Sequence, residues 1–162
     1  MGHPSASDDQ QRAEGIILSA LAARLGVALA PRSLFLEGGS RVDVDGVAAD
    51  DSVFVEVYAH QGRLRGGQFH KVARDALKLI TLNRCGHDAR LILVLGDDEA
   101  VACVTAKSWL SEALRVWGIE VLPAEMDDPM REALRGAQAR QVMVNPSDSA
   151  PHDDAVGHEV VS

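Results

Sequence analysis

The hydrophobic and polar positions near the start of the chain follow the period of a helix. Apolar residues recur at helical spacing at Ile17, Leu21 and Leu25. A capping-box pattern begins at Ser7, and Gly26 follows the last apolar position. The pattern predicts a helix that begins near Ser7 and ends at Gly26.

The next stretch changes to the period of two that strands follow. After a Pro-containing connection, residues 33–36 have the composition of a short strand. Residues 41–47 alternate polar and apolar side chains, and residues 53–60 are rich in β-forming residues. Because the turn-forming residues 49–52 separate these last two runs, they predict an antiparallel hairpin.

The following part of the chain alternates helices and buried strands. An apolar stripe at helical spacing predicts a helix over residues 68–82. Residues 90–95 and 119–122 are short apolar runs typical of buried strands, and residues 107–117 between them have a helical pattern. Strand, helix and strand at this spacing predict a parallel crossover and an α/β protein.

Length and composition predict one domain. A chain of 162 residues, 46% of them hydrophobic, can bury one ordinary core. A final helix is expected to start at Asp128, which is followed by proline, and to fade after Met143. We therefore expect a domain over residues 8–144, with disorder in residues 1–7 and in the Ser-, Pro- and Asp-rich tail 145–162.

No pattern in the chain predicts a membrane or secretory route. No apolar run approaches the roughly 20 residues of a spanning helix, and the first residues lack the order of a signal peptide, so we expect a cytoplasmic protein without membrane contact. Cys85 and Cys103 form no CxxC pair, which argues against a disulfide framework or a zinc site and predicts buried or idle thiols. Phosphate-binding loops and the GxSxG and HExxH motifs are absent, which excludes common nucleotide hydrolases, dehydrogenases, esterases and zincins.

Charge is distributed unevenly along the chain. The net charge is -8, but all 16 basic residues lie between Arg12 and Arg140, while acidic residues also occupy the two ends. The stretch from His60 to Arg84 is locally positive. This stretch either binds a phosphate backbone or is simply a helix face exposed to solvent. Arg63 and Arg65, beside glycines, suit phosphate binding, and a flexible basic loop is the alternative. The basic residues of the stretch are Arg63, Arg65, Lys71, Arg74, Lys78 and Arg84.

Carboxylates gather on the predicted hairpin. Period two places Glu56, Tyr58 and His60 on one face of the second strand, and Asp43 and Asp45 on one face of the first. A hairpin can bring Asp45 and Glu56 side by side, and two carboxylates that close repel unless a proton or a cation lies between them. Mg²⁺ or Mn²⁺ suits this position, because such an ion needs only one or two protein carboxylates and can also bind phosphate oxygens.

The stretch from Arg41 to Leu79 resembles the PD-(D/E)XK phosphodiesterase superfamily, which has the restriction-endonuclease-like fold. It is similar to the variant in uncharacterised bacterial nuclease-like proteins that carry Val-Asp-Gly, Glu-Val-Tyr-Ala-His and Gln-x-x-Lys elements. The resemblance implies an αβββαβ core with a mixed central sheet flanked by helices, here with an extra C-terminal helix. It also implies that Asp45, Glu56 and the Val57 carbonyl bind the metal.

One family position differs in this chain. The lysine expected two residues after Glu56 is Tyr58, which is neutral at physiological pH. In some branches that lysine lies on the following helix, and Lys71, one turn from Gln68, suits the relocation. The resemblance then implies that Lys71 assists the attacking water, and that Gln68 contacts the substrate or orders this water.

Each of these residues also has an ordinary structural interpretation. The acidic run 97–99 reads as a turn with a helix cap more readily than as a second acidic site. Trp109 and Trp117 lie in a helical pattern and are expected in the core or an interface. For the hairpin and its helix, the alternatives are a turn at Asp45, a buried salt bridge at Glu56, packing by Tyr58 and His60, capping by Gln68, and an exposed pair of Lys71 with Asp75.

Two hypotheses of function follow from the sequence. The first is a metal-dependent nucleic-acid phosphodiesterase that uses Mg²⁺ or Mn²⁺, with DNA favoured over RNA and with Arg63, Arg65, Lys71 and Arg74 near the phosphates. The second is a module of the same fold that has lost its chemistry with the strand lysine and binds nucleic acid or a partner protein. A homodimer is compatible with either.

Overall fold

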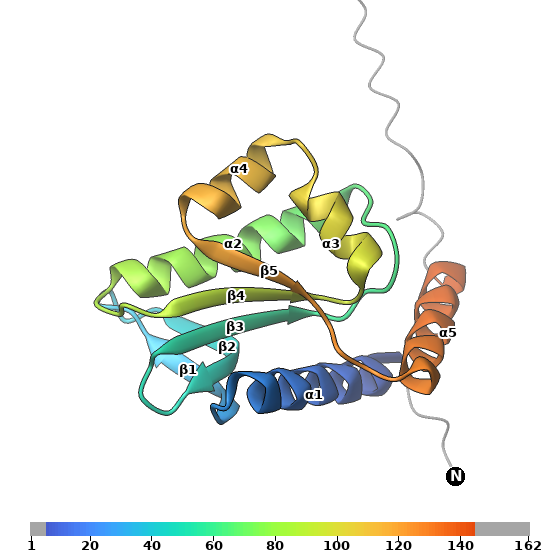
Figure 1. Ribbon diagram of the computed structural model, residues 1–162, viewed down its shortest axis with the longest axis horizontal. Helices are drawn as coiled ribbons and strands as arrows, with labels where there is room; N and C mark the ends of the chain where they lie inside the picture. Colours follow the sequence, from blue (N-terminus) through green and yellow to red (C-terminus); the bar gives the residue numbers. More distant parts are fainter. Residues whose placement is uncertain (1–5, 145–162) are drawn as a thin grey trace, which may run out of the picture.

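The computed structural model describes residues 6–144, which form a five-stranded mixed sheet with helices on both faces (Figure 1). The α/β class is therefore confirmed. Ala6 and Ser7 were expected to be disordered but belong to the first helix, which begins one residue earlier than the capping-box pattern predicts. The tails expected over residues 1–5 and 145–162 lie outside the described residues. The elements are α1 (Ala6–Leu25), β1 (Leu29–Phe35), β2 (Arg41–Ala48), β3 (Val53–Tyr58), α2 (Gly67–Arg84), β4 (Arg90–Leu95), α3 (Asp98–Thr105), α4 (Trp109–Val116), β5 (Ile119–Pro123) and α5 (Asp128–Val144).

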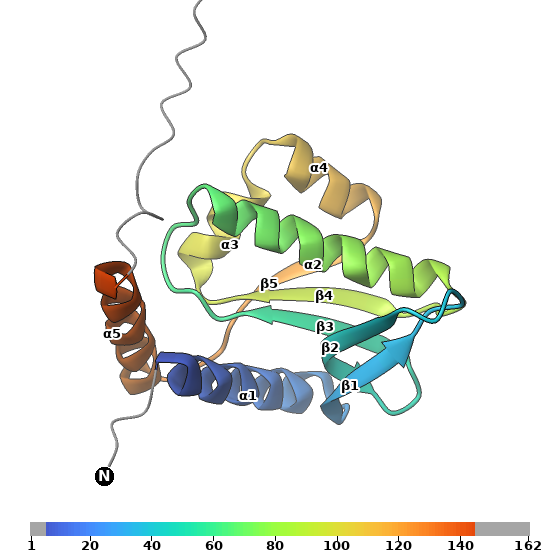
Figure 2. The same ribbon diagram turned by 180° about the vertical axis from the view of Figure 1, so that it is seen from behind.

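The strands lie in the sheet in chain order, β1-β2-β3-β4-β5. β2 is antiparallel to both of its neighbours, β1 and β3, which confirms the hairpin of β2 and β3. β3, β4 and β5 are parallel, which confirms the crossover. Helices α2, α3 and α4 cover one face of the sheet, and α1 covers the other, as Figure 1 and Figure 2 show from opposite sides. α5 contacts α1.

Two layers of apolar side chains hold the helices to the sheet. Phe54 on β3 belongs to the cluster under α2, together with Leu79 of that helix. Val55 and Val57 belong to the cluster under α1, together with Ile17. The two faces of β3 therefore alternate as period two predicts, and both are buried because helices cover both sides of the sheet.

The edge strand β1 is longer than the sequence predicts. Its first half is the Pro-containing stretch that was interpreted as a connection, and Ala30 pairs there with Val47 of β2. Beyond Pro31 the register shifts by one residue, because Arg32 pairs with Val44, so Pro31 faces the two residues 45–46 across a bulge. Proline is tolerated at such a place, because an edge strand does not need every N–H for the ladder.

The helical pattern between β4 and β5 is two helices instead of the one expected over residues 107–117. Asp97 caps α3 by accepting a hydrogen bond from the Ala100 N–H at 2.9 Å, so the interpretation of the acidic run as a cap is confirmed. Ser108 starts α4 in the same way, through the N–H of Ser111 at 3.1 Å. A second cap residue inside the predicted segment therefore separates the two helices.

The two tryptophans and the two cysteines are less buried than a core position requires. Trp109 is 77% exposed and Trp117 is 43% exposed, so the expectation of a core position is wrong, because the short α4 buries its leucines instead. Cys85 is exposed and Cys103 is half-buried, and neither forms a disulfide. None of the helices in the described part of the chain has the length and apolar character to span a membrane.

Candidate functional site

The strands β2 and β3 part just beyond their short ladder, and we call this place the fork. The strands pair at Gly46 with Val55 and at Val47 with Phe54. In place of a further backbone bond, the Asp45 carboxylate (Oδ2) accepts a hydrogen bond from the N–H of Val57 at 2.9 Å. Asp45 is thus held against β3 at the point of divergence, next to Glu56. The cross-strand approach expected from the hairpin is the arrangement found, and Asp45 is more than a turn residue.

Glu56 is the most buried acid of the fork. Its residue is 2% exposed, and its Oε2 lies 2.6 Å from Nζ of Lys78. Its Oε1 is buried without a hydrogen-bond partner among the described residues. Burial raises the pKa of Glu56 to about 8, and the charges of Asp45 and Asp75 act in the same direction while Lys78 opposes them. The buried salt bridge that was the structural alternative therefore satisfies only one of the two carboxylate oxygens.

Lys78 is a site residue that the sequence argument missed. Its ammonium also donates to the backbone oxygen of Asp43 at 2.9 Å, so it connects α2 to both strands of the fork. A signal was available, because Lys78 lies seven residues, or about two helical turns, after Lys71 and so on the same face of α2.

Lys71, the predicted catalytic ammonium, contacts different groups. Its Nζ lies 2.6 Å from Oδ2 of Asp75 and 5.4 Å from the ring centroid of Tyr58. The pair with Asp75 was expected to be exposed, but the Asp75 side chain is only 4% exposed. The lysine that touches Glu56 is therefore Lys78, while Lys71 is a half-buried ammonium held beside Tyr58.

A further acid, Glu14, approaches the fork from α1. Burial raises the pKa of Glu14, and the nearby charges of Asp45 and Asp75 raise it further, whereas a hydrogen bond from Gln10 and the charge of Lys71 lower it. Nothing in the pattern of an amphipathic helix distinguishes Glu14 from other surface acids, so only the fold could identify it. The cluster then holds four carboxylates, of Glu14, Asp45, Glu56 and Asp75, against the ammonium groups of Lys71 and Lys78.

The structure does not bring the Asp43 carboxylate into this cluster. Asp43 is exposed, and its Oδ1 accepts hydrogen bonds from Ser33 at 2.5 Å and from Arg41 at 2.9 Å. These two hydrogen bonds lower the pKa of Asp43. The bulge opposite Pro31 lies just beyond this position and breaks the regular alternation of β2, so the carboxylates of Asp43 and Asp45 have separate partners.

The donor set of the fork suits only certain metals. Among residues 6–144, no three His, Cys, Asp or Glu side chains are arranged to hold a metal ion together. The fork offers Asp45 and Glu56, an unpartnered Oε1 and an excess of negative charge. These residues fit Mg²⁺ or Mn²⁺, which keep several waters and need one or two carboxylates, and they do not fit the closed ligand set of zinc.

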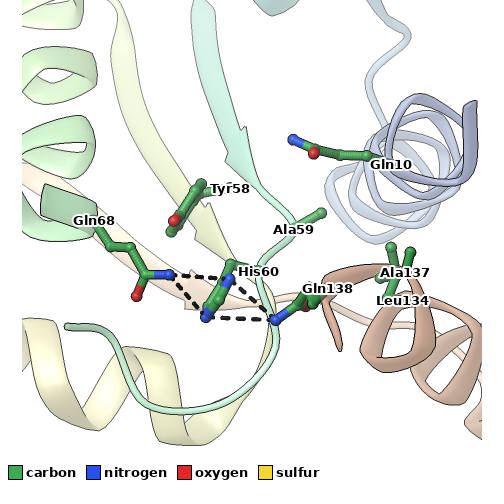
Figure 3. A pocket seen from close by; sticks show the side chains of 8 residues that line it. All are labelled: Gln10, Tyr58, Ala59, His60, Gln68, Leu134, Ala137 and Gln138. Carbon is green, nitrogen blue, oxygen red and sulfur yellow. Dashed lines mark hydrogen bonds between the residues drawn. The ribbon is translucent and has the colours of Figure 1, made fainter. Parts of the chain in front are cut away.

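Tyr58 and His60, which share a strand face with Glu56, line a pocket beside the fork (Figure 3). Their rings stack with centroids 5.7 Å apart. The His60 ring lies 3.2 Å from the amide nitrogen of Gln68 and 3.1 Å from that of Gln138 on α5. Burial lowers the pKa of His60. The Oε1 of Gln68 accepts from the N–H of Arg65 at 2.8 Å, in the loop just before α2.

The basic residues predicted to meet phosphates are available for this role. Arg63, Arg65 and Arg74 are exposed, and none forms an ion pair with a described carboxylate. Arg63 and Arg65 lie in the loop before α2, whose first turn has no acidic residue and whose start at Gly66 has no side-chain cap. A helix start of this kind favours an anion.

Comparisons with protein-family models, with curated proteins and with solved structures give no match.

Proposed function

We propose that the protein is a metal-dependent nucleic-acid phosphodiesterase whose reaction centre is the fork between β2 and β3. The observation that carries the proposal is the buried Glu56, with one unpartnered carboxylate oxygen, beside Asp45. A buried acid left half-paired costs free energy, and a fold retains such a group where a function needs it. The order α1, β1, β2, β3, α2, β4 supports the same proposal, because it is the order of the αβββαβ core that the sequence resembles.

Asp45 and Glu56 would hold one Mg²⁺ or Mn²⁺, with the Val57 carbonyl as the further ligand that the resemblance implies. When bound, such an ion offsets the charge on the phosphate and lowers the pKa of a water. Asp45 is positioned for this role by the Val57 N–H. Glu56 gives up its proton more readily near a cation, because a positive charge opposes the effects of burial and of Asp45 on its pKa.

The two lysines would have different roles in the reaction. Lys78 is held between Glu56 and the Asp43 backbone oxygen, so it orients the Glu56 carboxylate. Lys71 is held by Asp75, and its side chain is 34% exposed, so its ammonium can reach a phosphate oxygen or the attacking water. Hydrolysis forms a P–O bond from water and breaks the bond to a sugar oxygen. Lys71 then stabilises the negative charge that grows on the phosphoryl group.

Arg63, Arg65 and the start of α2 would bind the phosphates on either side of the reacting one. Arg74 lies about one turn beyond Lys71 and would extend this contact along α2. Binding through phosphates is independent of base sequence and weakens with salt. The net charge of -8 does not prevent it, because these guanidinium groups are exposed and unpaired within the described chain.

The experiment is a cleavage assay with the full chain. Plasmid, single-stranded DNA and RNA are incubated with the protein in Mg²⁺, in Mn²⁺ and in EDTA. We expect cleavage only with metal, and a loss of about a hundredfold or more in Glu56→Gln, Asp45→Asn and Lys71→Ala. Glu37→Gln, at an exposed position outside the cluster, is the matched control and should cut normally. Failure to cut any of the three substrates with either metal would refute the proposal.

One observation favours a second function. Both carboxylates of the fork already have partners within the protein, Asp45 with the Val57 N–H and Glu56 with Lys78. We propose as the alternative a non-catalytic module that binds nucleic acid. It predicts binding in EDTA that weakens in Arg63→Ala and Arg65→Ala, with no cleavage in any metal. If the protein neither binds nor cuts nucleic acid, a partner protein becomes the ligand to seek.

A further inference from the structure

The pocket at the end of β3 has a composition that phosphate hydrolysis does not require. It has a volume of about 180 Å³ and is formed by α1, α2, α5 and the end of β3, so α5 contributes to it although the cleavage proposal uses no residue of this helix. Gln68 and Gln138 approach His60 from two sides in Figure 3. The volume is below the roughly 300 Å³ at which drug-sized pockets begin, and it suits one small ring system. Its lining residues are Gln10, Tyr58, Ala59, His60, Gln68, Leu134, Ala137 and Gln138.

The pocket is polar without being charged. None of the described residues that line it is Asp, Glu, Lys or Arg. Burial lowers the pKa of His60, so its ring is neutral at physiological pH. The stacked rings of Tyr58 and His60 add an aromatic wall. An ion such as a phosphate has no counter-charge here, whereas a neutral planar group with hydrogen-bonding edges fits.

Hydrogen bonds to the backbone fix which way both amides point. Gln68 accepts from the Arg65 N–H through its oxygen, at 2.8 Å. Gln138 accepts from the Gln61 N–H through its oxygen, also at 2.8 Å, and donates to the Gln61 backbone oxygen at 3.2 Å. Both NH₂ groups are therefore directed at His60, and neither amide can turn its oxygen to the ring without losing a backbone hydrogen bond.

This arrangement leaves more donors than acceptors. Two amides carry four N–H groups, one of which is used by Gln61, and a neutral imidazole has a single acceptor nitrogen. Two amide N–H groups therefore have no acceptor in this arrangement, and the second ring nitrogen of His60 adds another donor. A donor without an acceptor costs free energy, and an acceptor atom from a ligand removes that cost. A neutral group with two acceptors would therefore complete the arrangement.

The pocket adjoins the proposed reaction centre. The amide nitrogen of Gln10 donates to Glu14 at 3.1 Å, and Glu14 feels the charge of Asp45. Tyr58 lies between His60 and Lys71, stacked on the former and 5.4 Å from the latter. A group bound in the pocket is therefore next to a phosphate held at Lys71.

We infer that this pocket binds an unpaired nucleobase through an edge with two acceptors, and that of the two purines guanine fits it better. Guanine presents O6 and N7 together, whereas adenine presents one acceptor and one donor on the same edge. The base would be pulled out of a strand or already single-stranded, and it would lie on the aromatic wall. The inference rests on the proposed function, since it places the base beside the phosphate to be cut.

The experiment measures binding without cleavage. The full chain in EDTA is titrated with three fluorescent oligothymidylates of equal length that carry a central guanine, a central adenine or no purine. We expect the guanine oligonucleotide to bind at least about five-fold more tightly than the other two. Binding of free guanosine and adenosine monophosphates is measured in a second series. It distinguishes a pocket that needs the base within a strand from one that binds the free nucleotide. A preference for guanine in either series supports the inference and assigns the source.

Variants test whether the pocket causes the preference. Gln138→Leu should abolish it, and so should Gln138→Glu, which keeps the oxygen that accepts from Gln61 but removes the NH₂ donor. Gln11→Leu, an exposed glutamine on α1, is the matched control and should keep the preference. Thermal melting identifies any variant that fails to fold, and either Gln138 variant that folds decides the question.

Three results would overturn the inference: equal binding of the oligonucleotides and of the nucleotides, a preference that survives in Gln138→Glu, or no binding of any of them. The proposed function is judged separately. Cleavage in Mn²⁺ without a base preference would refute only the inference about the pocket. A guanine preference without cleavage would refute only the proposed hydrolase function.

Discussion

The half-paired Glu56 allows a quantitative prediction about stability. Replacing Glu56 by Gln keeps the shape of the side chain and removes the charge, while Lys78 keeps the Asp43 backbone oxygen as a partner. In the folded protein the pKa of Glu56 is raised from its ordinary value of 4.5 to about 8. Over the interval between these values the folded protein holds a proton that the unfolded chain has lost. Stability is therefore full below 4.5 and falls as the pH rises to about 8.

The size of the effect follows from the shift. Each unit of pKa corresponds to about 1.4 kcal/mol, so over the interval from about pH 5 to pH 8 this one residue should lower the free energy of unfolding by about 4 kcal/mol. Glu56→Gln cannot lose this proton and should lack that part of the pH dependence. At about pH 8 the variant should then be more stable than the parent by a similar amount, although it should have no cleavage activity.

The assay is urea unfolding of both proteins, followed by circular dichroism in EDTA, across this pH range. The difference between the two curves isolates Glu56, because other acids such as Glu14 titrate in both proteins. Parallel curves would refute the reasoning, since they would mean that Glu56 is no more costly to ionise in the fold than in the unfolded chain.

Two further predictions test the metal and the packing around the site. Mn²⁺ should raise the melting temperature of the parent, and the rise should be larger at about pH 8 than at about pH 6, because protons compete with the metal for Glu56. Asp45→Asn should remove the rise. An unchanged melting curve in the parent would contradict the metal assignment. Gly96→Ala should lower the free energy of unfolding by about 3 kcal/mol or more, because the added Cβ would lie 2.0 Å from the backbone oxygen of His60 and a backbone atom cannot turn aside. Gly15→Ala, on an open face of α1, is the control and should raise the free energy of unfolding by up to about 1 kcal/mol. Both variants are measured by urea unfolding. Equal effects of the two substitutions would show that the contact at Gly96 is not tight.

Local periodicity was enough to predict most of the elements. The alternation of Val55, Glu56 and Val57 placed the acid on one face of β3 and the valines on the other, as found. This works because strand and helix periods are properties of the backbone, so burial on one side leaves a repeating trace in the chain. The same reasoning failed at Pro31, where the register of an edge strand depends on its neighbour rather than on its own residues.

The choice of partners within the candidate site came mostly from the tertiary structure. The sequence offered the pair of Lys71 with Asp75 as one alternative but did not bring Lys78 into the site, and the packing of α2 on the sheet assigned Lys78 to Glu56. Gln138 meets His60 across 78 positions of the chain, and Glu14 approaches the fork from a separate layer. A pattern along the chain records which face of an element is buried, but which side chains meet depends on how the elements are docked. The sequence by itself therefore determined most of the elements and the pair of acids Asp45 and Glu56, and folding decided their counter-charges and the pocket beside them.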